Sequence, residues 1–486
     1  MDPFVALCVW LILLLALLCL DPAKDSGISF ALWIPVIWMT IVASRLPSIW
    51  LNYTAGYTAG TMAQALEDGN LLDRTISIVL ILLAVGILTS RSFQWGDFLR
   101  RNIALIALIF FGLLSVLWSD FPLVAFKRWF RDLAMYFMIP VVLCDPHPLE
   151  AVRTLLRRVS YMLLPLSLLL IKYYPAIGTH YTVWGGRECT GVATSKNGLG
   201  VLCLVSGLFF FWDTLTRWSA RKEWRTRKII AVNLAFLAMT LRLLYLAQSA
   251  TSNSCFVIGC AVILIVQGGI GKRHPVFLRV LLPLSFLVYA ILAYSFNLNS
   301  QLAPMVGRNS DLTNRTFMWS VLLDMHTNPL FGVGYQCFFL GDHLQLFWQR
   351  FGGKVTEAHN GYLGVYLNLG LIGLFVLIAF LVGSYRTILK RLKPFSSFAS
   401  LSLAIWTVVL FYNVTEEAMK LHLIWVTFLL VAINVPVRDE QRIPDLAKFD
   451  NLGAVTKFTR LPQETGVAQL RRSSIVGKQN HVLRRD

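Results

Sequence analysis

The chain has 486 residues, of which 56% are hydrophobic and 14% are charged. Soluble domains carry about 25% charged residues, so this composition excludes an ordinary soluble protein. The 44 basic and 26 acidic residues give a net charge of +18, which would suit nucleic acid, but the basic residues gather in short loops between apolar runs. That distribution indicates membrane topology and argues against nucleic-acid binding.

Runs of about twenty apolar residues recur along the chain, and such runs are long enough to cross a bilayer as helices. The sequence therefore predicts an all-α integral membrane protein with about 12–13 transmembrane helices and one large outer loop that contains short amphipathic helices. The candidate spans are residues 4–20, 28–44, 71–89, 102–118, 129–144, 159–174, 196–215, 229–247, 254–268, 276–296, 362–385, 398–413 and 421–436.

When these spans are threaded in order, the basic loops all fall on one side of the membrane. The loops cover residues 91–101, 153–158, 217–228, 272–273 and 386–393. Because cytoplasmic loops are enriched in Lys and Arg, we assign this side to the cytoplasm and the N-terminus to the outside. The membrane domain is predicted over residues 1–436, and a basic cytoplasmic tail, disordered by composition, over residues 437–486.

Three basic residues break this rule at the outer end of the span at 129–144. Lys127, Arg128 and Arg131 are predicted to lie on the outer side, where basic residues are disfavoured. Attraction of a lipid-linked phosphate would explain them. The alternative is that they snorkel along an interfacial helix.

The outer segment at 175–195 is rich in glycine and aromatic residues, which suits sugar stacking and close backbone approach. It contains Arg187 and Glu188 and leads into Lys196 and Asn197 at the start of the next span. Asn197 is a candidate N-cap. Lys196 opposes the helix dipole there, unless a bound anion or Glu188 compensates it. Arg187 and Lys196 are therefore candidate anion-binding residues.

The longest polar segment is the outer loop at 297–360. Irregular backbone is not tolerated against lipid, so this loop must lie outside the bilayer. An amphipathic helix is predicted to begin at Asp311 and to stop before Asn328. Arg315 then falls in its first turn, where free N–H groups already favour anions, and Arg308 precedes it in the same loop. A local ion pair between Arg315 and Asp311 is the alternative.

His359 closes this loop, and Asn360 is a candidate N-cap for the span that follows. Histidine changes charge near neutral pH, which suits a general base, although a structural histidine is the alternative. Glu416, in a distant outer turn, is predicted to support the site by orienting a cationic group. No Asp-x-Asp pair lies on the outer face, so no metal and no cofactor are expected.

Cys189 and Cys337 are the two cysteines in outer loops. An oxidising compartment would permit a disulfide between them. The sequence gives no distance between the two residues, so two free thiols are the favoured prediction.

Together these segments resemble the O-antigen ligase and polysaccharide polymerase superfamily of bacterial envelopes, over most of the chain. His359-Asn360, followed by Gly370 and Gly373, fits a recurrent family pattern. The segments at 307–319 and 329–334 look like the family's large periplasmic loop, and those at 118–122 and 191–197 look like other recurrent segments. The chain departs from family ligases at 248–254, where a serine-rich turn stands in place of an arginine and looks more like the exopolysaccharide polymerases.

The resemblance implies a metal-independent glycosyltransferase at the periplasmic face of the bacterial inner membrane. Its donor would be a saccharide on undecaprenyl pyrophosphate, and its acceptor a lipid-linked or lipid A core saccharide. Polymerisation of repeat units is favoured over ligation, because a surplus of outer cations suits two lipid pyrophosphates. The implied roles are a base (His359), pyrophosphate binding (Arg128, Arg187, Lys196, Arg308, Arg315) and support (Asn360, Glu416).

Two rival classes of function remain. A lipid-linked oligosaccharide flippase or other transporter should carry its polar residues within the helices at the bilayer midplane, whereas here they gather at one face. A non-enzymatic assembly or receptor subunit is the second rival. Membrane lipids, a chain-length regulator and a flippase are the expected partners of the enzyme.

Overall fold

The computed structural model describes residues 2–22, 27–51, 70–181, 186–268, 283, 286, 311–392 and 397–435. This part of the chain is helical apart from a small antiparallel hairpin of β1 (Thr179–Tyr181) and β2 (Arg187–Cys189). The predicted all-α class is therefore confirmed. The predicted span 276–296 is almost entirely outside the described residues, and Arg308 and the predicted tail lie wholly outside them.

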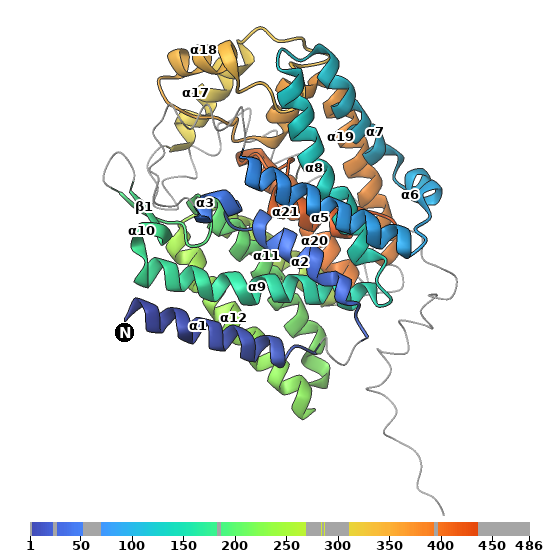
Figure 1. Ribbon diagram of the computed structural model, residues 1–486, viewed down its shortest axis with the longest axis vertical. Coiled ribbons are helices and arrows are strands. Elements are labelled where there is room, and N and C mark those ends of the chain that lie inside the picture. Colours follow the sequence, from blue (N-terminus) through green and yellow to red (C-terminus); the bar gives the residue numbers. More distant parts are fainter. Residues whose placement is uncertain are drawn as a thin grey trace, which may run out of the picture. The chain divides into compact units, whose positions relative to one another are not determined.

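The other twelve predicted spans each coincide with a helix or a helix pair (Figure 1). Within the described ranges, seven helices are long and apolar enough to cross a membrane, which makes the chain a multi-pass membrane protein. They are α5 (Leu71–Ser90), α9 (Pro148–Tyr173), α11 (Lys196–Arg217), α12 (Trp224–Ala247), α13 (Ala250–Gln267), α19 (Gly361–Leu392) and α20 (Ser397–Thr415).

The remaining predicted spans are less regular. An eighth candidate is bent by 95° between α6 and α7, and α8 is 22 residues long but carries four charged side chains. The other apolar helices are shorter. The bounds are α1 (Pro3–Cys19), η2 (Phe30–Leu32), α2 (Trp33–Val42), α3 (Pro47–Leu51), α6 (Trp95–Arg101), α7 (Ile103–Leu114), η3 (Ser115–Trp118), α8 (Pro122–Leu143), α10 (Pro175–Gly178), η4 (Trp218–Ala220) and α21 (Leu423–Ala432).

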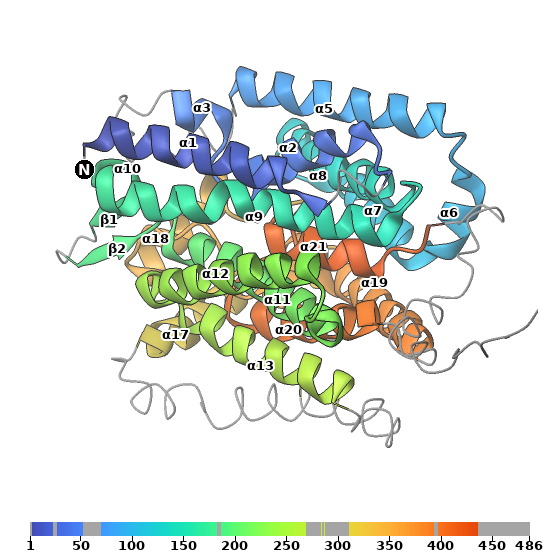
Figure 2. The same ribbon diagram turned by 90° about the horizontal axis from the view of Figure 1, so that it is seen from below.

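Two long helices form the centre of the membrane domain. In α11 and α20, 83% of the most apolar stretch is buried, against 22% in α5, which lies at the edge in Figure 2. α11 packs against α12 and α13, and α13 packs against α20. The N-terminal ends of α11 and α13 are thereby held next to the C-terminal end of α20.

The described part of the predicted outer loop, residues 311–360, packs onto the N-terminal part of α19. α17 (Asp311–Leu323) begins where the sequence predicted and ends a few residues earlier, and α18 (Gly341–Phe351) follows it. Their apolar faces share a small core with the N-terminal part of α19 (Met318, Leu322, Met325, Phe338, Phe347, Ala358 and Leu367). Residues 311–360 therefore form a folded cap on the N-terminal end of α19.

α19 is broken at Gly370, where φ is 65° and ψ is −167°. The segment at 329–334 inserts into the break and satisfies the backbone groups that the break leaves open, as an apolar environment requires. Its hydrogen bonds are Val333 N to Leu367 O (3.2 Å), Gly334 N to Asn368 O (2.9 Å), Leu371 N to Pro329 O (2.9 Å) and Ile372 N to Leu330 O (3.2 Å). The break thus fixes the outer end of α19 against the loop.

The topology gives a first testable prediction. Gln349 lies on α18 in the outer loop, whereas Ser219 and Ser397 lie at the other ends of α11 and α20, joined by the hydrogen bond from Trp212 Nε1 to Ser397 O (2.8 Å). In intact cells, an impermeant maleimide should therefore label Gln349→Cys but neither Ser219→Cys nor Ser397→Cys. Asn309 and Thr182 are also predicted to face outward, but both lie outside the described residues. Labelling of Ser219→Cys from outside would overturn the whole arrangement.

Candidate functional site

Several helix ends meet where the outer loop returns to α19. The N-termini of α11 and α13 reach the C-terminal end of α20, through the hydrogen bond from Asn197 Nδ2 to Glu416 Oε1 (2.9 Å) and the one between the hydroxyls of Thr251 and Thr415 (2.8 Å). The N-terminus of α19 joins them, because Gly361 N donates to Glu416 O (3.0 Å). Three helix N-termini therefore converge at one place, and their partial positive charges favour an anion there.

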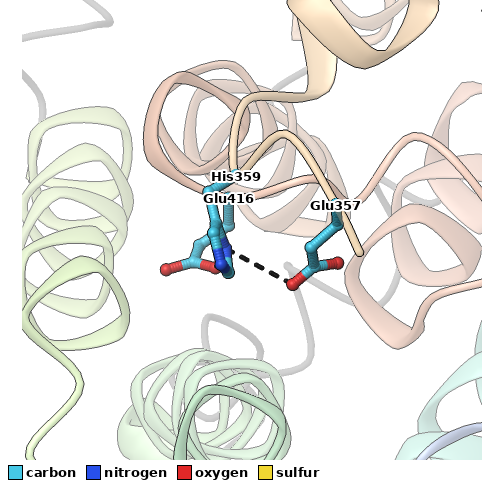
Figure 3. A group of neighbouring side chains, drawn as sticks. All are labelled: Glu357, His359 and Glu416. Carbon is cyan, nitrogen blue, oxygen red and sulfur yellow. Dashed lines mark hydrogen bonds and ion pairs between the residues drawn. The ribbon is translucent and has the colours of Figure 1, made fainter. Parts of the chain in front are cut away.

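His359 lies at this convergence with a left-handed backbone (φ 46°). Its Nδ1 is 3.3 Å from Glu357 Oε1 and 3.4 Å from Glu416 Oε2 (Figure 3). Carboxylates accept hydrogen bonds, so this arrangement favours the tautomer with the proton on Nδ1. The unprotonated nitrogen is then Nε2, which is the form a general base requires.

Glu416 connects the predicted base to two other elements. Its side chain is only 7% exposed. One oxygen, Oε1, accepts from Asn197 Nδ2 and from Arg315 Nη2 (3.0 Å), while Oε2 faces His359. A buried carboxylate requires such compensation. The predicted supporting residue therefore touches both the predicted base and one of the predicted anion-binding arginines.

Arg315 is docked on the turn that follows α20. Its Nη1 donates to the carbonyl oxygen of Thr415, and its Nη2 donates to Glu416. The side chain is 22% exposed. The acidic partner of Arg315 is thus about a hundred residues away in sequence, and the side chain of Asp311, the local alternative, lies outside the described residues.

A second ion-pair network flanks the site on the side of Glu357. Lys420 Nζ is 3.2 Å from Glu357 Oε2 and 3.5 Å from Glu417 Oε1, and Glu417 Oε2 accepts from Ala358 N (2.8 Å). Burial favours the neutral forms, but Lys420 and His359 hold the pKa of Glu357 below its ordinary value, and Glu417 and Glu357 raise the pKa of Lys420. Both members of the pair are therefore charged at neutral pH.

The other described residues that were predicted to bind an anion each have a partner of their own. Lys196 Nζ is 2.7 Å from Glu188 Oε1, which confirms the predicted compensation of the helix dipole. Arg187 is exposed at the start of β2 and donates to Ile171 O (3.4 Å). Arg128, on α8, donates to the carbonyl oxygen of Gln336 in the loop after α17.

The two predicted N-caps have different outcomes. Asn360 Oδ1 accepts from Tyr362 N and Leu363 N, both at 3.0 Å, so this cap is confirmed. The cap assigned to Asn197 is wrong, because α11 begins at Lys196 and its N-cap is Ser195. The hydroxyl oxygen of Ser195 accepts from Gly198 N (3.1 Å). Asn197 is thereby free to bind Glu416.

Four residues of the site were missed from the sequence: Asn197 as a ligand of Glu416, Glu357, Lys420 and Trp319. The indole of Trp319 donates to Ala358 O (2.9 Å) and so fixes the turn before His359. The sequence features that could have indicated them were short spacings from predicted site residues. Glu357 precedes His359 by two residues, and Lys420 follows Glu416 by four. Such spacings are too common to select these residues without the fold.

Cys189 and Cys337 are both free thiols, as the favoured prediction had it. Cys189 lies on β2. Cys337 is buried in the loop after α17, with its Sγ 3.3 Å from Tyr335 O. The two outer loops are therefore held by ion pairs and packing, without a disulfide between these residues.

Glu357, His359 and Glu416 could also hold a metal ion, because their donor atoms all lie within 4.8 Å of one another. Each carboxylate already binds a cationic side chain, Lys420 at Glu357 and Arg315 at Glu416. A metal ion would have to compete with both. The donor set alone therefore does not favour a metal over the existing ion pairs.

Two comparisons bear on the family. Residues 234–378, from α12 to the first half of α19 and including His359, match the family model described as O-antigen ligase. The chain is also similar to the exopolysaccharide production protein ExoQ of Rhizobium meliloti (strain 1021), with 26% identity over 308 residues. That alignment covers 59% of this chain and 65% of the relative, less than two thirds of its length. The two findings confirm the predicted resemblance to the O-antigen ligase and polysaccharide polymerase superfamily.

Proposed function

We propose that this protein polymerises oligosaccharide repeat units linked to undecaprenyl pyrophosphate into surface polysaccharide, at the periplasmic face of the bacterial inner membrane. The observation that carries the proposal is the position of His359. Its imidazole is oriented by a buried carboxylate at the point where three helix N-termini and Arg315 converge. A base and an anion site are what this transfer needs in one place.

In this reaction His359 Nε2 takes the proton from a hydroxyl group of the acceptor sugar. The hydroxyl oxygen then forms a bond to the anomeric carbon of the donor, and the bond from that carbon to the pyrophosphate oxygen breaks. The electron pair leaves with undecaprenyl pyrophosphate. Glu416, beside Nδ1, stabilises the imidazolium that forms, in the way an acidic residue assists a catalytic histidine elsewhere.

The leaving group carries its own negative charge, which grows as the bond breaks. The helix N-termini and the cations Arg187, Lys196, Arg308 and Arg315 are proposed to neutralise it, with Arg128 as a further candidate. Because Arg315 is bound to Glu416 in the structure, the pyrophosphate would share or replace that partner. No metal or cofactor is required by this scheme.

Arg315 offers a second testable prediction. Arg315→Ala should lower the transfer rate about a hundred- to a thousand-fold, the usual cost of losing one positioned electrostatic donor. Arg315→Lys should restore only part of it, because an ammonium cannot reproduce the guanidinium fork that spans Thr415 and Glu416. Transfer by the purified variants, normalised to inserted protein, is the measurement.

A matched control lies on α18, in the same loop. Arg350 makes an exposed ion pair with Asp324 (3.1 Å), and such pairs contribute little. Arg350→Ala should therefore transfer at the wild-type rate. Equal losses in Arg315→Ala and Arg350→Ala would remove the specific role of Arg315.

The decisive experiment is reconstitution of the purified chain in detergent with lipid-linked repeat units, with and without EDTA. Chain growth in this single compartment supports a transferase and excludes transport as the basic activity. A strain that lacks the gene separates polymerase from ligase. Loss of a polymerase leaves single repeat units on their acceptor, whereas loss of a ligase leaves long chains on undecaprenyl pyrophosphate.

The match to a family model described as O-antigen ligase supports the alternative function, transfer of the lipid-linked glycan to lipid A core. The similarity to an exopolysaccharide production protein favours polymerisation. Accumulation of long stranded chains in the deletion strain would contradict the proposal and establish the alternative.

A further inference from the structure

Two carboxylates reach the same nitrogen of His359 from different surroundings. The side chain of Glu416 is 7% exposed and is held by Arg315 and Asn197. The side chain of Glu357 is 37% exposed and is held by Lys420, which is itself 30% exposed. Figure 3 shows the imidazole of His359 with the side chains of Glu357 and Glu416 beside it, and Nδ1 is about equally far from the two carboxylates (3.3 and 3.4 Å). The base therefore has an enclosed side at Glu416 and an accessible side at Glu357.

The two sides also differ in charge. On the enclosed side, Glu416 is balanced by Arg315, and Glu188 is balanced by Lys196, so the partial positive charges of three helix N-termini outweigh the partial negative charge at the single C-terminal end of α20. On the accessible side, Lys420 faces two carboxylates, Glu357 and Glu417, which leaves an excess of one negative charge. A pyrophosphate would be attracted to the first side and repelled from the second.

We propose that Glu357 and Lys420 form the binding subsite for the acceptor saccharide, on the accessible side of His359. This inference rests on the proposed function and specifies where its second substrate lies. Sugar hydroxyl groups both donate and accept hydrogen bonds, so they can donate to the Glu357 carboxylate and accept from the Lys420 ammonium group. The pair holds the acceptor against the imidazole while the pyrophosphate of the donor occupies the opposite side.

The charge state of the pair supports this role. The pKa of Glu357 is held below its ordinary value, and the pKa of Lys420 is raised by its two carboxylate partners, so the pair presents one full acceptor and one full donor to a hydroxyl group. Hydrogen bonds to charged groups are stronger than those between neutral groups. Trp319 supports the geometry of the pair, because its indole donates to the carbonyl oxygen of Ala358, the residue after Glu357.

The test measures binding of two separate probes to the purified full-length chain, without transfer. The first probe is the repeat-unit oligosaccharide, released from its lipid by mild acid so that it carries no pyrophosphate. The second is inorganic pyrophosphate. Lys420→Gln should weaken binding of the oligosaccharide about tenfold or more, the effect of losing a hydrogen bond to a charged group, and should leave pyrophosphate binding unchanged.

Lys196→Gln is the matched control, because Lys196 is a similarly exposed lysine that is paired with Glu188 (2.7 Å) and adjoins Asn197, the residue that binds Glu416. It should weaken pyrophosphate binding and leave oligosaccharide binding unchanged. Lys420 also holds Glu417, so Lys420→Arg is needed to separate binding from folding. Lys420→Arg keeps the charge and should retain most of the oligosaccharide affinity.

Three results would overturn the inference: no oligosaccharide binding by the wild-type chain, wild-type affinity in Lys420→Gln, or equal loss of both probes in Lys420→Gln with a lowered unfolding temperature. A different result would overturn the proposed function alone. If the oligosaccharide binds as described and the reconstituted chain still transfers nothing, the result supports the proposed acceptor subsite and contradicts the proposed polymerase activity.

Discussion

His359→Ala is expected to abolish detectable transfer while the protein still inserts. General bases contribute about 10²- to 10⁴-fold to rate, and the imidazole of His359 is the one that contacts both Glu357 and Glu416 among the described residues. Transfer of the lipid-linked saccharide by purified protein is the measurement. His326→Ala is a suitable control, because His326 is an exposed histidine of the same loop. Near-normal transfer by His359→Ala at normal expression would remove the assignment of the base.

The backbone of His359 makes a second substitution necessary. Its φ of 46° lies in the left-handed region, which Asn tolerates better than Ala. His359→Asn therefore removes the base with less strain in the turn. We expect His359→Asn to be as inactive as His359→Ala and to be inserted at least as well. Recovery of transfer in His359→Asn would show that the alanine variant fails through its backbone.

Much of the fold could be predicted because membrane helices are encoded locally. Apolar runs give the spans, and the amphipathic pattern after Asp311 gives α17 inside the outer loop. Asn360 could be assigned as a cap because capping links a side chain to backbone groups two and three residues away. These interactions need no knowledge of tertiary structure.

The contacts that build the site could not be predicted in the same way. Glu416 binds Asn197, Arg315 and His359, which precede it by 219, 101 and 57 residues. No periodicity links positions so far apart, and each residue taken alone has a plausible local role. Asn197 illustrates this, since its sequence position suggested a helix cap while its side chain is used to hold Glu416.

The break in α19 could not be predicted from the sequence for a related reason, because it depends on a segment that is distant in the chain. Gly370 lies in a continuous apolar run, so the sequence predicted one uninterrupted span over residues 362–385. Other glycines of α19 allow close packing against side chains, since a Cβ at Gly361 would meet Asn413 at 2.2 Å and a Cβ at Gly364 would meet Glu417 at 2.7 Å. At Gly370 the neighbour is instead the backbone of the inserted segment, which comes from about forty residues earlier in the chain.

The contact between Gly370 and the backbone of Leu330 leads to the second large expected effect. A Cβ at Gly370 would lie 2.2 Å from the carbonyl carbon and oxygen of Leu330, and backbone atoms cannot move aside as a flexible side chain can. The dihedral angles of Gly370, φ 65° and ψ −167°, also fall in a region that is essentially restricted to glycine. Strain of about 1–3 kcal/mol and overpacking of about 1–3 kcal/mol together are a large fraction of the roughly 5–15 kcal/mol by which most domains are stable.

Gly370→Ala should therefore lower the thermal unfolding temperature in detergent markedly and reduce transfer, because the segment at 329–334 would be displaced from the break that fixes the outer end of α19 and His359. Gly383→Ala is the matched control on the same helix, since a Cβ there meets nothing within 4 Å and alanine is the better helix former. It should unfold at the wild-type temperature or slightly above it. If Gly370→Ala unfolds and transfers like Gly383→Ala, the inserted segment does not hold the site, and the position of His359 must depend on its ion pairs with Glu357 and Glu416 alone.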